Sequence, residues 1–353
     1  MPYRIGVVGF RRGTGPAHVF AALPDCQIAA VCELDARLRD CAHEQFPGVE
    51  TFSDYAEMLR QGLDVVVVAT PVPLHAEHST MALEAGCHVL QEVTLAGNVQ
   101  QCHELLQAVK AHPHQKFMLA ENCNYWAHVM SWHRMFADGL LGEFMYAEAE
   151  YIHDVRSLLR DAGGKPTWRA SLPPIHYCTH SLGPLLSITG ERCISASGLR
   201  VASKLDPDRG HTPIEVGIFQ TASGGVIKVL CAFGIVREPM FHYYTLYGTK
   251  GTLETERPPE SPRTNAYLEA VPYLQGMARL PLGYDVPGAP AAAALGGHGT
   301  TEHYMIQDFM DCVRNDTKPP IDIYTALDMA LPGLCAHESA LNGGGAVPVP
   351  DWR

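Results

Sequence analysis

The sequence has no run of about 18 or more uncharged apolar residues, the length that a membrane-spanning helix requires. It also has no excess of positive charge, because 26 lysines and arginines stand against 38 acidic residues and the formal net charge is −12. A nucleic-acid-binding protein needs a basic face to displace counterions from phosphates, so this balance excludes a polyanionic partner. The first residues, MPYRIGVVGF, lack a basic segment followed by an apolar one, and we expect no secretory leader.

The eleven cysteines include no Cys-x-x-Cys pair. Most stand within apolar patterns, as Cys32, Cys87, Cys231 and Cys335 do, where a free thiol packs as a small hydrophobe. Together with the missing leader, this usage predicts a reducing, cytoplasmic location. Apolar residues make up 46% of the chain and charged residues 18%, which is typical of a folded protein, and 353 residues suffice for two domains.

The first third of the chain alternates short apolar runs with helical patterns. The runs are RIGVV, QIAAVCELD (27–35), LDVVVVATP (63–71), CHVLQEV and KFMLAEN. Nearly continuous apolar runs between helices are typical of parallel strands that are covered on both faces. We therefore predict an α/β fold whose first domain, residues 1–123, is a doubly wound parallel sheet.

From about Tyr125 the pattern changes to alternating runs, with ASGG and GTKG as turns between antiparallel strands. Residues 257–300 are rich in proline, glycine and alanine, and we expect a long surface excursion there. Two helical segments, at about 301–342, close the chain. The second domain is therefore predicted to cover 124–353.

The turn after the first strand, GFRRGTGPAHV, has the glycines that a dinucleotide fold needs beside a pyrophosphate, notably Gly9 and Gly13. Arg11 stands where Gly-x-Gly-x-x-Gly has its second glycine. Glu33 ends the second strand, 24 residues after Gly9. A carboxylate there can accept from both ribose hydroxyls and repels a 2′-phosphate, which favours NAD.

Two alternatives remain open at this turn. Asp35 is a competitor for the ribose, and Arg11 and Arg12 could hold a phosphate, so NADP is the less favoured alternative cofactor. Thr70 and Pro71 end the next strand, at the edge of the sheet that faces a cofactor.

The segments IGVVGF, VVVVATPVPLHAEHSTMALEAGCHVLQEV and YGTKGTLE resemble the Gfo/Idh/MocA oxidoreductases, NAD(P)-dependent sugar and polyol dehydrogenases. The resemblance spans nearly the whole chain. It implies an N-terminal NAD-binding Rossmann domain and a C-terminal α/β substrate domain with a large, mainly antiparallel open sheet. In the family the outer face of that sheet commonly joins subunits, which implies a homodimer or homotetramer.

The family's Glu-Lys-Pro motif, whose lysine acts near the nicotinamide, is replaced here by EVT at 92–94, and its Asp-x-x-x-His pattern by His176-x-x-x-His180. The chain is more similar to a branch of NAD-dependent glycosidases, glycoside hydrolase family 109. These have Glu-Val-Pro, Tyr-Pro-Thr-His and Gly-His-Gly, matched by EVT, YCTH (177–180) and GGHG (296–299). Thr94 and Cys178 stand where that branch has proline, so its substrate does not transfer.

Motifs and resemblance together give the candidate site residues. Cofactor-binding candidates are Gly9, Arg11, Arg12, Gly13, Glu33, Thr70, Pro71, His75, Glu92, Val93 and Asn122. Substrate-binding candidates are Tyr151, His153, Arg169 and His298, and catalytic candidates are His180, Tyr177, His176 and Tyr151. The resemblance implies that Glu92, Val93 and Asn122 touch the nicotinamide end, that Tyr151 and Arg169 bind sugar hydroxyls, and that Tyr177 lies between cofactor and sugar.

Removing a hydride from a sugar carbon requires a base for the hydroxyl proton. Histidine as a residue type titrates near neutral pH, so His180 is the candidate base. If the prolines of PPIHYCTHSLGP start a helix, His176 and His180 lie one turn apart on one face. In the glycosidase scheme, oxidation at C3 acidifies the C2 proton, the C1 substituent is eliminated, water adds and NADH returns the hydride. His153, His176 and His298 could instead be ordinary polar contacts.

Three functions fit these residues. The favoured one is NAD-dependent hydride transfer at a ring hydroxyl carbon of a sugar or glycoside, with redox-assisted cleavage as its sharper form. The second is plain sugar dehydrogenation or ketoreduction, and the third is a non-catalytic sensor, which the absent lysine favours. Glu150, His153, His176 and His180 offer an alternative open site for zinc or manganese, but we do not predict a metal.

Overall fold

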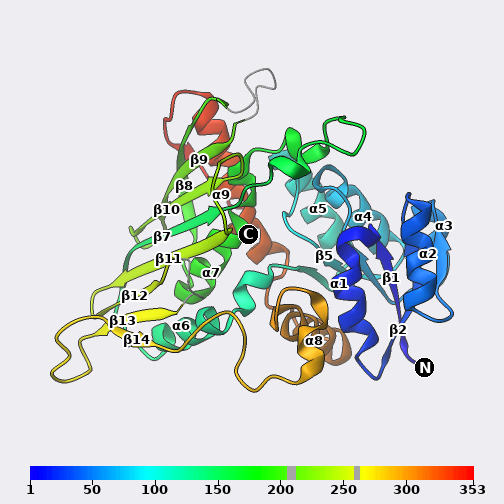
Figure 1. Cartoon of the computed structure of the whole chain (residues 1–353), viewed down its shortest axis with the longest axis horizontal. Helices are drawn as coiled ribbons and strands as arrows, with labels where there is room; N and C mark the ends of the chain where they lie inside the picture. The colour runs from blue at the N-terminus through cyan, green and yellow to red at the C-terminus, as the bar shows by residue number, and fades with distance from the viewer. Residues whose placement is uncertain (205–211, 258–262) are drawn as a thin grey trace. The chain divides into compact units, whose positions relative to one another are not determined.

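The computed structural model describes residues 1–204, 212–257 and 263–353, which form two compact units (Figure 1). The N-terminal unit combines residues 1–125 with 287–327, and the second unit combines 126–286 with 328–353. The predicted break at residue 123 therefore falls close to the first observed one. Residues 258–262 of the expected surface excursion lie outside the described residues.

The N-terminal unit is built on a six-stranded sheet. Its strands are β1 (Tyr3–Val8), β2 (Cys26–Cys32), β3 (Glu50–Phe52), β4 (Val65–Val68), β5 (His88–Gln91) and β6 (Phe117–Leu119). Its helices are α1 (Phe10–Ala21), α2 (Ala36–Gln45), α3 (Tyr55–Leu59), α4 (His75–Glu84), α5 (Val99–Ala111) and α8 (Thr301–Asn315), with 3-10 turns η1 (Val72–Leu74), η2 (Asn122–Tyr125) and η7 (Ala291–Gly296).

The strand order is β3-β2-β1-β4-β5-β6, and every pairing is parallel. This is the doubly wound order, so the prediction for the first domain is confirmed. All four residues of β4 are buried valines, as expected for a central strand covered on both faces. Side chains cap three helices: Asp35 accepts from the N–H of Arg37, Asp54 from that of Glu57, and Asn98 from that of Gln101.

The segment 287–327 belongs with this unit, whereas the sequence analysis placed its helices in the second domain. Two ion pairs explain the difference. Arg314 on α8 donates to Asp25 at 2.7 and 2.8 Å, and Arg12 on α1 donates to Glu302 on α8 at 2.6 Å. Because these partners are almost 300 positions apart, no local pattern could assign α8 to the first domain.

The second unit is built on a nine-stranded sheet. Its strands are β7 (Phe144–Ile152), β8 (Cys193–Arg200), β9 (Ile214–Thr221), β10 (Val226–Ala232), β11 (Phe241–Gly248), β12 (Gly251–Thr255), β13 (Thr264–Leu268), β14 (Ala278–Leu280) and β15 (Val347–Pro348). Its helices are α6 (Ala127–Ala137), α7 (Thr179–Thr189) and α9 (Ile323–Leu341), whose first residues lie in the N-terminal unit, with 3-10 turns η3 (Arg156–Leu158), η4 (Trp168–Ala170) and η5 (Pro174–Tyr177).

The sheet order is β14-β13-β12-β11-β7-β10-β9-β8-β15, and among these strands only β7 and β10 pair in parallel. The predicted large, mainly antiparallel sheet is thus confirmed. β13 and β14 extend it through the region expected to be an excursion, since Thr264 and its neighbours alternate between buried and solvent-facing positions.

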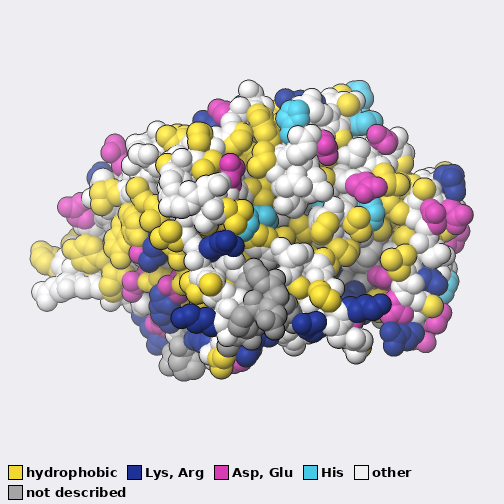
Figure 2. Space-filling view, turned by 90° about the horizontal axis from the view of Figure 1, so that it is seen from above, with side chains coloured by type: hydrophobic (Ala, Val, Ile, Leu, Met, Phe, Trp, Pro, Cys, Tyr) yellow, Lys and Arg dark blue, Asp and Glu magenta, His cyan; other side chains and the backbone are white. Residues whose placement is uncertain are grey.

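Helices α6, α7 and α9 cover one face of this sheet (Figure 1). Strand register places one row of buried residues on the covered face: Ala196, Phe219, Ile227, Ala147, Leu246, Leu253 and Ala266. The outer face carries several exposed apolar side chains at different levels of the register: Leu199, Ile218, Tyr247 and Tyr267. Figure 2 shows hydrophobic side chains gathered at the end of the view where this sheet lies. Within the described ranges, no helix has the length and apolar character needed to cross a bilayer.

Gly198 on β8 lets α9 approach the sheet. A Cβ at this position would overlap the backbone oxygen of Ala336, and the Gly198 N–H donates to Ser339 Oγ at 2.9 Å. We therefore expect Gly198→Ala to lower the free energy of unfolding by about 3 kcal/mol, because α9 must move away. The measurement is thermal and denaturant unfolding, with Gly276→Ala as control because a Cβ there meets nothing within 4 Å. Equal stability of the two variants would contradict this packing.

Candidate functional site

The pyrophosphate turn of the N-terminal unit begins at Gly9, between β1 and α1. Its φ is +86°, and a Cβ there would lie 2.5 Å from the backbone oxygen of Ala69, so only glycine fits. α1 begins at the next residue, Phe10, which places its first N–H groups at the carboxyl edge of the sheet. A helix N-terminus at that edge attracts phosphate. Gly13 packs directly against the side chain of Val7, which brings α1 close to β1.

The Glu33 carboxylate is already fixed by backbone donors. Its Oε2 accepts from the N–H of Phe10 at 2.9 Å, and its Oε1 accepts from Leu34 and Asp35 at 2.8 and 3.2 Å. A carboxylate oxygen has two lone pairs, so Oε2 can accept a second hydrogen bond, from a ribose hydroxyl. The competitor Asp35 instead caps α2 through the N–H of Arg37 at 3.0 Å. The geometry therefore favours Glu33 over Asp35.

Arg12 lies between two buried carboxylates. Its Nη2 is 2.8 Å from Glu92 Oε1 and 2.6 Å from Glu302 Oε1. Burial acts to lower the pKa of Arg12, but Glu92 and Glu302 outweigh it, and the pKa is raised. Arg11 is exposed. The sequence analysis treated both arginines as phosphate-binding candidates, and the structure gives them different surroundings.

His75 is buried, and both of its ring nitrogens face backbone oxygens. Nδ1 lies 2.7 Å from Thr94 O, and Nε2 lies 2.7 Å from Thr70 O. Burial lowers the pKa of His75, although the two carbonyl contacts act against it. The imidazole thus braces the loop after β4, with Thr70 and Pro71, against the loop after β5, whose Val93–Thr94 peptide bond is cis.

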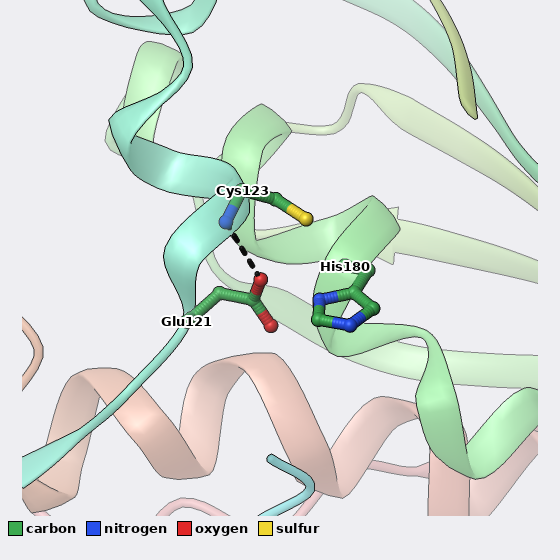
Figure 3. A group of neighbouring side chains, drawn as sticks. All are labelled: Glu121, Cys123 and His180. Atoms are coloured by element: carbon green, nitrogen blue, oxygen red, sulfur yellow. Dashed lines mark hydrogen bonds between the residues drawn. The ribbon is translucent and has the colours of Figure 1, made fainter. Parts of the chain in front are cut away.

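Asn122, at the start of η2, is buried beside Glu121 and Cys123. The N–H of Cys123 donates to Glu121 Oε1 at 3.2 Å, the dashed line in Figure 3. Burial first, with Glu121 adding to it, raises the pKa of the Cys123 thiol well above its ordinary value. The thiol is therefore protonated and is not a nucleophile. Asn122 follows β6, so its amide stands at the same carboxyl edge as Gly9 and Glu92.

These observations test whether the N-terminal unit fits a dinucleotide. The edge offers a glycine that no other residue can replace, a helix N-terminus and a carboxylate with spare acceptor capacity, which suit a pyrophosphate and a ribose. Glu92, Val93 and Asn122 follow β5 and β6, on the side of the sheet toward the nicotinamide in this strand order. The residues present therefore fit NAD.

In the second unit, Tyr151 near the end of β7 is the centre of an aromatic group, which we call the Tyr151 cluster. Its ring neighbours are His242 (4.2 Å between centroids, stacked at 19°), Phe233 (4.9 Å), His180 (5.5 Å), His153 (5.9 Å) and Tyr177 (6.5 Å). The Tyr151 hydroxyl also lies 3.1 Å from His153 Nδ1. The structure thus brings four sequence-predicted residues together: Tyr151, His153, Tyr177 and His180.

His180 projects from the first turn of α7 (Figure 3). The hydroxyl of Tyr244 on β11 donates to the His180 backbone oxygen and so ties this turn to the sheet. Arg169 reaches the cluster as well, because its Nη1 donates to the Tyr177 hydroxyl at 3.4 Å. These contacts fix the segment that carries the predicted base.

His242 is a residue that the sequence analysis missed. Strand register pairs it directly with Tyr151 across β7 and β11, and only 5% of its surface is exposed. Burial first, and then neighbouring histidines, lowers the pKa of His242 well below its ordinary value. The run MFHYYTLYG alternates in a way that predicts a strand, but its pairing partner depends on a register that a single sequence does not reveal.

His176 has different surroundings from His180, so the expected pairing of the two on one helical face is wrong. The prolines start the 3-10 turn η5, which ends at Tyr177, and α7 begins only at Thr179. The His176 ring packs at 5.1 Å against that of His337. Burial, followed by His337, lowers the pKa of His176 to about 3.

The four residues of the alternative metal site do not converge. Side chains alternate along β7, so Glu150 lies on the face opposite Tyr151, where Arg257 donates to it at 2.5 and 2.7 Å. His176 packs against His337, and only His153 and His180 border Tyr151. This ligand set is therefore not assembled in the structure.

His298 lies in the N-terminal unit, in the Gly-His-Gly turn before α8. Its Nδ1–H donates to Glu302 Oε1 at 3.2 Å, and its side chain is about half exposed. The sequence analysis placed it at the substrate without identifying Glu302 as its partner. The spacing His-x-x-x-Glu at the start of a helix is a signal that could have suggested the pair.

Two family models match the chain. Residues 3–120 match the oxidoreductase family with an NAD-binding Rossmann fold, known as Gfo/Idh/MocA, and residues 287–353 match the C-terminal domain of glycosyl hydrolase 109. These matches confirm the resemblance that the motifs indicated.

Curated relatives and solved structures agree with the models. A glycosyl hydrolase family 109 protein of Solibacter usitatus is 28% identical over 99% of this chain and 88% of its own length. An alpha-N-acetylgalactosaminidase of Shewanella oneidensis is 24% identical over 99% of this chain and 84% of its own. A levoglucosan dehydrogenase in complex with NADH has a TM-score of 0.83 at 19% identity, covering 99% of this chain and all of that one, and shares the fold.

Acid should destabilise the second unit. Burial keeps three of its histidines neutral in the folded state, with the pKa of His128 near 4 and that of His176 near 3, and His242 also lowered. In the unfolded chain their pKa is about 6.5, so below that pH unfolding takes up protons. Each histidine should lower the free energy of unfolding by about 1.4 kcal/mol per pH unit as the pH falls from about 6.5 toward the pKa of that histidine in the folded state.

Denaturant unfolding between about pH 7 and about pH 5 measures this loss. His176→Phe should flatten the acid slope, whereas His133→Phe, at an exposed position on α6, should leave it unchanged. Stability that stays constant or rises on acidification would contradict the assignment.

Proposed function

We propose that this enzyme, which joins a Gfo/Idh/MocA Rossmann domain to a family 109 C-terminal domain, acts on a sugar or glycoside by hydride transfer at a ring hydroxyl carbon. The carbon is C3, and the reaction is redox-assisted cleavage of a glycoside. The cofactor is NAD rather than NADP, because Glu33 faces the position of a 2′-phosphate with a carboxylate. The matched relatives bear glycosidase names, which supports the cleavage form.

The Tyr151 cluster is the observation that carries this proposal. Redox-assisted cleavage moves protons at the C3 hydroxyl, at C2 and at the leaving oxygen, so it needs several proton-transfer groups around one ring. His153, Tyr177 and His180 all border Tyr151, and no lysine stands at the place of the family's catalytic one. A simple dehydrogenase needs only one such group.

Bound NAD⁺ supplies a hydride acceptor for C3 and, once reduced, the hydride that restores it. His180 takes the C3 hydroxyl proton, because histidine is the side chain that most often serves as a general base. The C3 ketone makes the C2 proton acidic, and the hydrogen-bonded Tyr151–His153 pair takes it as the C1 substituent leaves with a proton. Water then adds its hydroxyl to C1 and a proton to C2. Arg169 and His298 bind sugar hydroxyls in this scheme.

We also propose that the enzyme is cytoplasmic and assembles as a homodimer or homotetramer through the outer face of the nine-stranded sheet. Leu199, Ile218, Tyr247 and Tyr267 are exposed apolar side chains on this face, beside charged pairs such as Lys228 with Glu148. Apolar side chains on an exposed face with polar surroundings are typical of a subunit interface. The cytoplasmic location rests on the composition and cysteine usage.

The experiment uses a panel of nitrophenyl glycosides and free sugars with trace NAD⁺, following released nitrophenol and NADH absorbance together. Redox-assisted cleavage predicts nitrophenol in excess of the NAD⁺ present, without accumulation of NADH. NADH in stoichiometric amount without nitrophenol would make the enzyme a plain dehydrogenase and would overturn the cleavage form.

His180→Ala should lower kcat by about 100-fold to 10,000-fold, because it removes the base, while NAD⁺ binding survives. Calorimetry of NAD⁺ binding and the assay above measure the two effects separately. His133→Ala is the matched control, since that histidine is exposed on α6 of the same unit. Near-normal turnover by His180→Ala would show that His180 is not the base.

Ile218→Arg should convert the oligomer to monomers, because it places a charge at an exposed apolar position of the outer face. Sedimentation velocity measures the change. Leu341→Arg, at an exposed apolar position near the end of α9, should leave the assembly intact. A monomeric wild-type enzyme, or equal effects of both variants, would contradict this interface.

A further inference from the structure

Four charged or titratable side chains meet within the N-terminal unit, and the proposed function uses only some of them. Arg12 Nη2 is 2.8 Å from Glu92 Oε1 and 2.6 Å from Glu302 Oε1, and His298 Nδ1 is 3.2 Å from that same Glu302 oxygen. The side chains of Glu92 and Glu302 are only 7% and 0% exposed. We call this group the Arg12 network.

The Arg12 network lies at the cofactor edge of the sheet. Arg12 is in the first turn of α1, the helix whose N-terminus faces a pyrophosphate, and Glu92 directly follows β5. Glu302 is in the first turn of α8, and Gly296 packs so closely on it that any side chain there would overlap the carboxylate. The network therefore joins the pyrophosphate turn, the nicotinamide loop and the start of α8.

The charges explain why Arg12 stays in this position. Two carboxylates that are almost fully buried repel each other unless a cation lies between them. A planar guanidinium presents several N–H donors in a fixed fork, so it can serve both carboxylates, whereas an ammonium is a single point charge. The orientation of Glu92 thus depends on Arg12, and the position of Arg12 depends on Glu302.

The same geometry speaks against Arg12 as a phosphate ligand. Its guanidinium already pairs with two carboxylates, which raise its pKa although burial acts to lower it. A phosphate would approach the negative pair as well as the arginine. Arg11, which is exposed one position earlier on α1, has no such restriction.

We infer that Arg12 and Glu302 form a positioning pair that orients the Glu92 carboxylate toward the nicotinamide end of the cofactor. Glu302 holds Arg12, and Arg12 holds Glu92. This inference rests on the proposed function, because it assumes that NAD binds at this edge. Neither Arg12 nor Glu302 contacts the reacting atoms, and both act through Glu92.

The test compares two ligands by calorimetry, NAD⁺ and ADP-ribose, which has the pyrophosphate and both riboses but no nicotinamide. Arg12→Met should weaken NAD⁺ binding about tenfold, while ADP-ribose binding changes by less than about twofold. Glu302→Gln should show the same selective loss, because Arg12 loses the charge that holds it. This variant leaves the Arg12 and Glu92 side chains unchanged, so it tests the inference even where Arg12→Met fails to fold. In the double variant the loss should not exceed that of the worse single variant, because both residues act along one route.

Two controls define the alternatives. Arg11→Met should weaken both ligands equally if that arginine contacts phosphate, so the ratio of their affinities stays unchanged. Arg314→Met breaks another α8 ion pair of the same unit, with Asp25 just before β2 at the opposite edge of the sheet, and should alter neither ligand's affinity.

The outcomes separate this inference from the proposed function. Selective loss of NAD⁺ binding supports the positioning pair whether or not a sugar substrate has been found. Equal loss of both ligands in Glu302→Gln, or no loss of either, would overturn the pair and leave the proposed function standing. Failure of the wild-type enzyme to bind NAD⁺ would overturn both.

Discussion

A single guanidinium between two buried carboxylates holds the cofactor edge of the N-terminal unit together. Glu92 and Glu302 come from distant parts of the chain, and Arg12 supplies the positive charge between these two buried side chains. Gly296 lies against Glu302, and His298 hydrogen bonds to it, so the Gly-His-Gly turn depends on the same charge. Arg12, one position after the residue that replaces the second glycine of the usual pattern, provides this cation.

In the second unit, the candidate site residues are held by ring stacking and burial. Its Tyr151 cluster gathers histidines and tyrosines, and burial lowers the pKa of His153 and His242 within it. His242 stacks on the ring of Tyr151 and supports it from one side. Burial lowers the pKa of His242 well below its ordinary value, so its imidazole is neutral. His180 stands on the first turn of α7, with its backbone fixed by Tyr244.

The sequence predicted what local pattern controls. The valines of β4 and the helix spacing around them determine a doubly wound sheet, and Glu33 at the end of β2 follows from the same pattern. Tyr151, Tyr177 and His180 were found through the resemblance. What could not be predicted depends on pairing across the chain: the register that places His242 on Tyr151, and the partner of Arg12. The two prolines before His176 were ambiguous, because they can open either an α-helix or the 3-10 turn that forms.

The N-terminal unit is interrupted in sequence, since 287–327 returns to it after the whole of 126–286 has passed. During synthesis on a ribosome, the first 125 residues therefore emerge before Glu302 and Arg314. Until Glu302 has been made, Arg12 has only Glu92 of its two carboxylate partners. Closing so long a loop costs little more free energy than closing one half its length, but it makes this contact one of the last to form. The complete Arg12 network can therefore form only after Glu302 has been made, although every strand of this unit's sheet lies within the first 125 residues.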